Sequence, residues 1–294
     1  MINSSEIASD PLTLVQGPPF LEKDRVATYH HPSGTSFLLR GGSDIAKLVS
    51  DPALADDWAE KQAQLMRWTR DNAMFNEADI TPISVIFESY FGKRGPLTGR
   101  VLDVGGGWGL FRRWWLEGVD SCFVVHDPGA ERFMTQPPAT LQRLYGKGLA
   151  KPIWFVEGFG EELPYQDSSY DMVMIAAALD HCADPARVLK ECHRVLRDDG
   201  HLLIIQGFDP DEGEMARTGL GLGSRLKRVL SDPRRLHRAI RQRIFHRGDP
   251  HIHHFSRSKL VALIAASGFS VPAETVLDTT NGVVAFESAK VVSP

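Results

Sequence analysis

Short apolar runs alternate with amphipathic stretches through the middle of the chain, from about residue 100 to residue 206. Five of the runs have the length of β-strands and lie at residues 100–104, 121–126, 152–156, 170–176 and 201–206. Helices are predicted between them at residues 109–117, 129–134 and 184–196. Because nearly continuous apolar strands that alternate with helices are typical of a parallel sheet covered on both faces, this pattern predicts an α/β domain.

The C-terminal part of the chain predicts a different ending for the sheet. A helix over residues 259–266 follows Ser256, which is a good helix-capping residue, and Gly268 ends it. Two further strands are predicted at residues 269–276 and 283–287, with the hairpin-turn pair Asn281-Gly282 between them. The whole pattern therefore predicts a seven-stranded sheet, made of five parallel strands and an antiparallel C-terminal hairpin, with helices on both faces.

Residues 1–95 lack this alternation and are predicted to form a partly helical N-terminal extension. Residues 56–72 have helix-forming composition, with Trp58, Leu65 and Trp68 on one face. The pair Thr81-Pro82 predicts the start of a second helix that ends near residue 91.

Composition excludes several classes of protein. In the 294 residues, 43% are hydrophobic and 24% are charged, which is ordinary for a globular chain and argues against a disordered or collagen-like protein. The apolar runs are far shorter than the ~20 residues that a membrane-spanning helix needs. The polar N-terminus and three cysteines without CxxC spacing predict a cytoplasmic protein without a secretory leader, a disulfide framework or a zinc ribbon.

Charge is distributed unevenly along the chain. Residues 217–247 carry ten lysines and arginines against one acid, Asp232, although the net charge of the whole chain is −4. Apolar residues at helical spacing interrupt the basic ones, which predicts a basic helical cap inserted at residues 208–250. Three interpretations stay open: a cap packed on the core, contact with anionic lipid headgroups, and recognition of a phosphorylated or nucleotide-bearing acceptor. Nucleic acid is not an expected partner, because the chain as a whole is acidic.

A glycine-rich loop after the first predicted strand is the sharpest local motif. Glycines stand at Gly105, Gly107 and Gly109, and Asp103 lies two residues before the first of them. The dinucleotide pattern GxGxxG would require a glycine at position 110, where the chain has Leu110. Glycines in such a loop let a ligand approach the backbone, and the acid suits a ligand with a cationic amine or sulfonium. The alternative interpretation is that these glycines only form a tight turn and bind no ligand.

Asp127 ends the second predicted strand, 24 residues after Asp103. An acid at this position is expected to accept hydrogen bonds from ribose hydroxyls. It is also suited to cap the helix that begins near Pro128, and the two roles are compatible.

Together these motifs resemble the class I S-adenosylmethionine-dependent methyltransferases, and within them the small-molecule branch that includes quinone-biosynthesis C-methyltransferases. The resemblance is carried by the glycine loop, Asp127 and four further segments, at residues 158–165, 170–173, 179–185 and 194–204. It implies a Rossmann-like methyltransferase fold over residues 96–294 and S-adenosylmethionine as cofactor. It also implies methyl transfer to a small-molecule acceptor, with oxygen slightly favoured over carbon.

The resemblance assigns cofactor-binding roles residue by residue. Asp103 and the loop residues Gly105, Gly107 and Gly109 would hold the methionine end of the cofactor. Asp127 would bind the ribose, and Ala176, at the end of the fourth core strand, would line the transferred methyl group. Phe159 stands where the family usually has an acid that contacts adenine, so Phe159 and Gly160 are expected to border that ring.

The acceptor side of the site is expected near two histidine-containing segments. Asp180 and His181 follow the fourth core strand, and His251 opens the run His251-Ile252-His253-His254. Asp180, His181 or His251 would take a proton or orient an acceptor hydroxyl. The structural alternative is that Asp180 caps a turn, that His181 packs beneath the cofactor and that the histidines at 251–254 belong to a polar lid.

No metal site is predicted at these histidines. The run at 251–254 and Asp249 invite that interpretation, but the side chains of His253 and His254 diverge because they are adjacent. The sequence also shows no second cluster of carboxylates.

Two other functional classes remain as alternatives to an enzyme of this family: a cofactor-binding relative without catalysis, and a nucleotide-dependent oxidoreductase, which Leu110 disfavours. The expected partner is a small-molecule acceptor, anionic or lipid-linked. The expected location is the cytoplasm, with peripheral contact at the anionic inner surface of a membrane as a further hypothesis.

Overall fold

The computed structural model describes residues 28–30, 36–40, 56, 58–63, 77–134, 139–208, 251–279 and 282–292. The predicted basic cap therefore lies outside the described residues, apart from Phe208 at its start.

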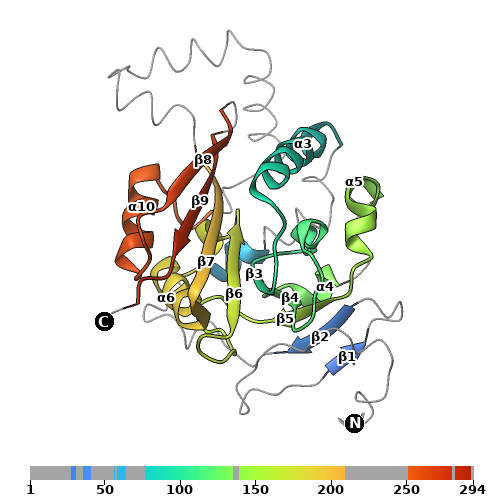
Figure 1. The fold of residues 1–294 in the computed structure, drawn as a ribbon, viewed down its shortest axis with the longest axis horizontal. Coiled ribbons are helices and arrows are strands. Elements are labelled where there is room, and N and C mark those ends of the chain that lie inside the picture. The colour runs from blue at the N-terminus through green and yellow to red at the C-terminus, as the bar shows by residue number, and fades with distance from the viewer. Residues whose placement is uncertain are drawn as a thin grey trace.

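One mixed sheet forms the centre of the protein (Figure 1), with the strand order β1-β2-β5-β4-β3-β6-β7-β9-β8. Its strands are β1 (Thr28–His30), β2 (Ser36–Arg40), β3 (Arg100–Val104), β4 (Cys122–Asp127), β5 (Ile153–Glu157), β6 (Tyr170–Ala176), β7 (Leu196–Gly207), β8 (Ala273–Asp278) and β9 (Val283–Ala289). The five strands from β3 to β7 are parallel, and β9 and β8 complete the sheet in antiparallel register. The predicted α/β sheet with an antiparallel C-terminal hairpin is confirmed.

The sheet is wider than predicted, because the described part of the N-terminal extension adds two strands to the seven expected. Strand β2 pairs in parallel with β5, and β1 pairs antiparallel with β2. The extension was predicted to be only partly helical. Strand β5 would otherwise present unpaired backbone groups at the sheet edge, and pairing with β2 satisfies them.

Helices cover both faces of the sheet. They are α3 (Glu77–Arg94), the 3₁₀ helix η3 (Leu110–Trp114), α4 (Ala130–Phe133), α5 (Ala139–Leu149), the 3₁₀ helix η4 (Leu179–His181), α6 (Pro185–Val195) and α10 (Arg257–Ala266). Asp184 caps α6 by accepting from the Arg187 amide at 3.0 Å, and Ser256 caps α10 as predicted.

Three helix predictions need correction. The helix expected at residues 109–117 is the short 3₁₀ helix η3, and α5 was not predicted. Helix α3 begins at Glu77 and continues through the pair Thr81-Pro82, which was expected to open it. A proline near the start of a helix removes one hydrogen bond, and the rest of this 18-residue helix outweighs that loss.

Two buried apolar clusters lie on opposite faces of the sheet because side chains alternate along each strand. Leu102 and Val104 of β3 face the cluster that contains α6 and α10. Val101 faces the second cluster, which contains α3, η3, α4 and α5. Helices from these two groups lie on either side of the sheet in Figure 1.

The parallel register brings the carboxyl ends of the central strands to one edge of the sheet. Val104 of β3 lies beside His126 of β4 on one side and Ile175 of β6 on the other. Loops that follow these strands therefore meet, and ligands of open α/β sheets bind at this edge. Within the described ranges, no helix is both long enough and apolar enough to cross a lipid bilayer.

Candidate active site

The glycine loop after β3 requires glycine for two different reasons. Gly107 and Gly109 have φ angles of +53° and +63°, which disfavour residues with a Cβ atom. A Cβ atom at Gly109 would lie 2.7 Å from Ile153 Cδ1 and 2.8 Å from Val125 Cγ2, so Gly109 packs tightly on the sheet. At Gly107 the nearest atom, Phe133 Cε1, would lie 4.0 Å away. The loop is thus anchored at one end and leaves space above Gly107.

Asp103 lies beneath this loop on β3 and is fully buried. Among the described residues, neither of its carboxyl oxygens accepts a hydrogen bond. A Cβ atom at Gly106 would lie 2.5 Å from the carboxyl group, so the loop covers the side chain. Burial, and then the nearby Asp127 carboxylate, raise the pKa of Asp103 well above its usual value. A cationic group bound at the loop would relieve this electrostatic cost.

Asp127 connects the loop after β3 with the loop after its own strand, β4. Its Oδ2 accepts from the Gly107 amide at 3.1 Å, and its Oδ1 accepts from the Gly129 amide at 2.7 Å. The Gly129 contact matches the predicted capping role, and carboxylate oxygens can accept further bonds. Burial raises the pKa of Asp127 to about 6, although the two amide bonds lower it.

Phe159 and Gly160 follow β5 but face different surroundings. The Phe159 ring lies edge-to-face with Trp58, with centroids 5.0 Å apart. A Cβ atom at Gly160 would lie 3.0 Å from Val104 Cγ1, so Gly160 allows close packing on the core. The predicted contact with adenine stays a prediction for both residues.

His126, next to Asp127, was not identified in the sequence as a site residue. Its Nε2 donates to the Phe159 carbonyl at 3.1 Å, because a carbonyl can only accept, and its Nδ1 accepts from the Tyr165 hydroxyl at 3.0 Å. Burial lowers the pKa of His126 to about 4, which favours the neutral imidazole that these two hydrogen-bond directions describe. His126 thereby holds the loop that carries Phe159.

The end of β6 borders the glycine loop. Ala176 is partly exposed there, and Ala177 has a φ angle of +49°. A Cβ atom at Gly105 would lie 2.4 Å from Ala178 Cβ, so the two segments are in direct contact. The predicted methyl-lining segment thus lies beside the predicted methionine-binding loop.

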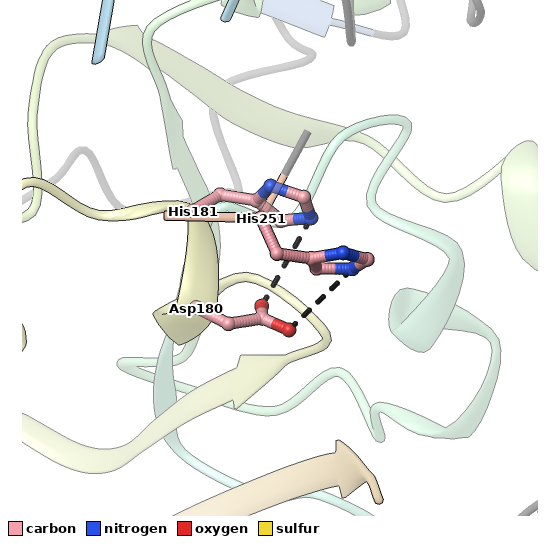
Figure 2. Close-up of side chains that lie close together, drawn as sticks. All are labelled: Asp180, His181 and His251. Carbon is pink, nitrogen blue, oxygen red and sulfur yellow. Dashed lines mark ion pairs between the residues drawn. The ribbon is translucent and has the colours of Figure 1, made fainter. Parts of the chain in front are cut away.

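Three predicted acceptor-side residues meet just beyond β6 (Figure 2): Asp180, His181 and His251. Nε2 of His251 lies 3.6 Å from Asp180 Oδ2, and Nε2 of His181 lies 3.9 Å from Asp180 Oδ1. The two imidazole rings stack with centroids 4.7 Å apart and an angle of 26°. Residues 70 positions apart in the chain therefore form one cluster, which we call the Asp180 cluster.

The Asp180 cluster is held by groups that sequence reasoning missed. Gln206, near the end of β7, donates its side-chain amide to Asp180 Oδ2 at 2.8 Å. A polar residue closing an apolar strand was the available signal. The Asp180 carbonyl accepts from the amides of Ile252 at 2.9 Å and His253 at 3.1 Å, which fixes the segment carrying His251.

Helical residues 58–63 of the N-terminal extension cover the cluster. Trp58 Nε1 donates to the His181 carbonyl at 3.0 Å, and the Gln62 amide donates to the same carbonyl at 3.1 Å. Lys61 Nζ donates to the His251 carbonyl at 2.9 Å. The extension is therefore part of the site, a role that the apolar face containing Trp58 did not reveal.

The parallel sheet, the glycine loop after its first core strand and the acid at the end of the next strand define the class I methyltransferase fold. Residues 102–204 match the profile of the methyltransferase domain family. A chain from a Haloferax volcanii complex that contains the Trm112 methyltransferase activator has the same fold, with a TM-score of 0.50 and 13% identity. That match covers 77% of this protein and 97% of the other chain.

Curated relatives match the same region. The ubiquinone/menaquinone biosynthesis C-methyltransferase UbiE of Hahella chejuensis is 34% identical over 114 residues, covering 37% of this chain and 43% of the relative. The ubiquinone biosynthesis O-methyltransferase of Marinobacter nauticus is 30% identical over 151 residues, covering 50% and 59%. The chain thus spans less than two thirds of the length of these relatives. Over residues 102–204 the chain is therefore similar to methyltransferase domains, and its curated relatives include quinone-biosynthesis methyltransferases.

Proposed function

We propose that this protein transfers a methyl group from S-adenosylmethionine to a small-molecule acceptor of the quinone type. The observation that carries the proposal is the contact between two segments with complementary chemistry. The glycine loop, with buried Asp103 and Asp127 beside it, touches Ala178, and the Asp180 cluster begins two residues further on. A cofactor site and an acceptor site would therefore be adjacent.

The residues around the loop fit this cofactor. S-adenosylmethionine supplies a methyl group bonded to a positively charged sulfur, next to an ammonium group. The buried Asp103 carboxyl without a hydrogen-bond partner among the described residues favours such positive charges. We assign the methionine end to Asp103, Gly105, Gly107 and Gly109.

The remaining cofactor contacts follow from the strand ends. Asp127 would accept hydrogen bonds from ribose hydroxyls with the lone pairs that the Gly107 and Gly129 amides leave available. Phe159 and Gly160 would border the adenine, and Ala176 the methyl group.

Asp180, His181 and His251 are assigned to the acceptor side. The acceptor atom bonds to the methyl carbon as the bond from that carbon to sulfur breaks, and the bonding electron pair leaves with sulfur. The proton of a hydroxyl acceptor is then taken up by Asp180, His181 or His251, which lie together at this position. Positioning and exclusion of water supply much of the acceleration in such a displacement.

An oxygen acceptor is favoured over a carbon acceptor because of the Asp180 cluster. Relatives named above include both a C-methyltransferase and an O-methyltransferase, so similarity alone favours neither. A hydroxyl must lose its proton, and groups suited to receive or stabilise it gather at this position. We also propose that residues 96–294 form the methyltransferase domain and that residues 1–95 extend it.

The test is formation of S-adenosylhomocysteine from S-adenosylmethionine with a panel of phenols and hydroquinones. We expect turnover with at least one acceptor, and the His251→Ala variant should lower kcat while leaving cofactor affinity unchanged. His254→Ala, which alters an exposed histidine of the same segment, is the matched control. Cofactor binding without turnover of any acceptor would favour the non-catalytic alternative.

A further inference from the structure

The Asp180 cluster has the composition of a metal site as well as that of a proton acceptor. Its three side chains each offer one ligand atom, and these atoms all lie within 4.8 Å of one another. Both imidazoles direct Nε2 toward the carboxylate (Figure 2). Two imidazole nitrogens with one carboxylate are a common ligand set for divalent transition-metal cations.

The distances favour a bridging cation over direct hydrogen bonds. The separations of 3.6 Å and 3.9 Å between Nε2 atoms and carboxylate oxygens exceed the length of a hydrogen bond. Around a cation with bonds of about 2.0–2.2 Å, neighbouring ligand atoms lie roughly 3.0–3.6 Å apart. Small side-chain rotations would therefore convert the observed arrangement into a coordinated one.

The environment of the Asp180 carboxylate is a second, independent indication of a metal site. The residue is only 6% exposed, and its Oδ1 accepts no hydrogen bond among the described residues. Its other oxygen accepts from Gln206, which fixes the orientation of the carboxylate. A ligating carboxylate that is oriented by an outer hydrogen bond is typical of metal sites.

We propose that Asp180, His181 and His251 bind one divalent transition-metal cation, for which Zn²⁺ is the best match. Three protein ligands leave a further coordination position for another molecule. The sequence argument predicted no metal ligand because it considered the histidines at 251–254 together with Asp249. The structure instead brings His251 to a carboxylate and an imidazole from the end of β6.

This proposal also specifies the acceptor class, and in that respect it rests on the proposed function. A divalent cation lowers the pKa of a bound hydroxyl and holds its oxygen in place. The cluster begins two residues after Ala178, which contacts the glycine loop. The acceptor would then be a phenol or an enol that binds the cation through oxygen.

The experiment measures metal binding on the full chain after treatment with a chelator, without cofactor. Calorimetric titration with Zn²⁺ should give one equivalent, and Co²⁺ should give a visible absorption spectrum from coordinated cobalt. Mg²⁺, which prefers oxygen ligands, should not compete. His251→Ala and Asp180→Asn should each weaken Zn²⁺ binding at least about tenfold and remove the cobalt spectrum, whereas His254→Ala should retain both.

Two results would overturn the site: no Zn²⁺ binding by the wild-type chain, or equal affinity in the wild type and both variants. His251 lies at a half-exposed position, so its variant should fold, and circular dichroism would verify this. S-adenosylhomocysteine titration of the same samples separates the two proposals. Metal binding without cofactor binding would support the metal site and contradict the proposed function. Cofactor binding without metal binding would contradict the metal site and leave the proposed function standing.

Discussion

At the scale of single residues, burial determines the charge of the groups around the loop. The pKa values of Asp103 and Asp127 are raised because both carboxyls are buried, and that of His126 is lowered for the same reason. A neutral His126 can donate to Phe159 and accept from Tyr165 at once. The raised pKa values mean that the charged form of both carboxyls is disfavoured beneath the glycine loop, and a bound cationic ligand would offset that cost.

Asp127 provides the first residue-scale prediction. Asp127→Asn should weaken S-adenosylhomocysteine binding about tenfold or more, because hydrogen bonds to a charged group contribute about 1.5–3 kcal/mol. Isothermal titration calorimetry measures the change. Glu157→Gln, at the paired position on β5, is the control and should bind normally. An unchanged affinity of Asp127→Asn for S-adenosylhomocysteine would mean that Asp127 only holds the two loop amides in place and does not bind the cofactor.

His126 predicts a pH dependence of stability. Its folded pKa of about 4 lies below the ordinary value of 6.5, so its contribution is fully present above pH 6.5 and is lost as pH falls toward 4. The loss should reach about 3 kcal/mol in the free energy of unfolding. Because the raised pKa values of Asp103 and Asp127 act in the opposite direction, the measured quantity is the difference between wild type and His126→Gln in urea unfolding. A difference that does not change with pH would contradict a neutral, buried His126.

The two ends of the glycine loop should respond differently to alanine. Gly109→Ala places a Cβ atom against Ile153 and Val125, so it should cost at least about 2 kcal/mol of stability. Gly107→Ala meets no close atom and should lose about 1 kcal/mol, from its positive φ angle alone, while weakening cofactor binding sharply. Thermal unfolding and calorimetric titration of both variants test this. Normal cofactor affinity in folded Gly107→Ala would argue against a ligand above the loop.

At the scale of elements, helical residues 58–63 are the least expected part of the site. They contribute three hydrogen bonds to the backbone carbonyls of the two cluster histidines. Trp58→Phe removes one of them but keeps an aromatic ring near Phe159. It should reduce stability by about 0.5–1.5 kcal/mol and raise the acceptor KM more than the cofactor KM. Equal KM values in the variant and the wild type would limit residues 58–63 to a structural role.

The sequence predicted correctly those helices and strands whose formation depends on residues close together in the chain. Strands β3 and β6 were predicted with their observed bounds because their apolar runs are uninterrupted, and the start of α6 because Asp184-Pro185 marks it. Strands β1 and β2 were missed because β2 pairs with β5, which is far along the chain, and β1 joins the sheet only through β2. The bond between Gln206 and Asp180 likewise depends on the neighbouring positions of β6 and β7 in the sheet.

The same distinction between local and long-range contacts applies to the site residues. Asp103, the glycines and Asp127 were predicted as site residues because they follow one strand-loop-helix unit and the strand after it. The Asp180 cluster was predicted as separate candidates, because only the folded chain shows that His251 meets Asp180.

At the scale of the whole molecule, a net charge of −4 conceals a basic segment at residues 217–247. The described body carries the predicted cofactor residues, and the basic segment lies outside the described residues. Recognition of an anionic acceptor or lipid by that segment stays a prediction. Binding to anionic vesicles that falls as salt is raised would support it, and no binding at low salt would contradict it.

The central claim is that the loop after β3 and the end of β4 hold S-adenosylmethionine. Calorimetric titration of the wild-type chain with S-adenosylmethionine, S-adenosylhomocysteine and NADH tests this most directly. We predict one equivalent of each of the first two ligands and no binding of NADH. Failure of both sulfur compounds to bind, or binding of NADH in their place, would contradict the account.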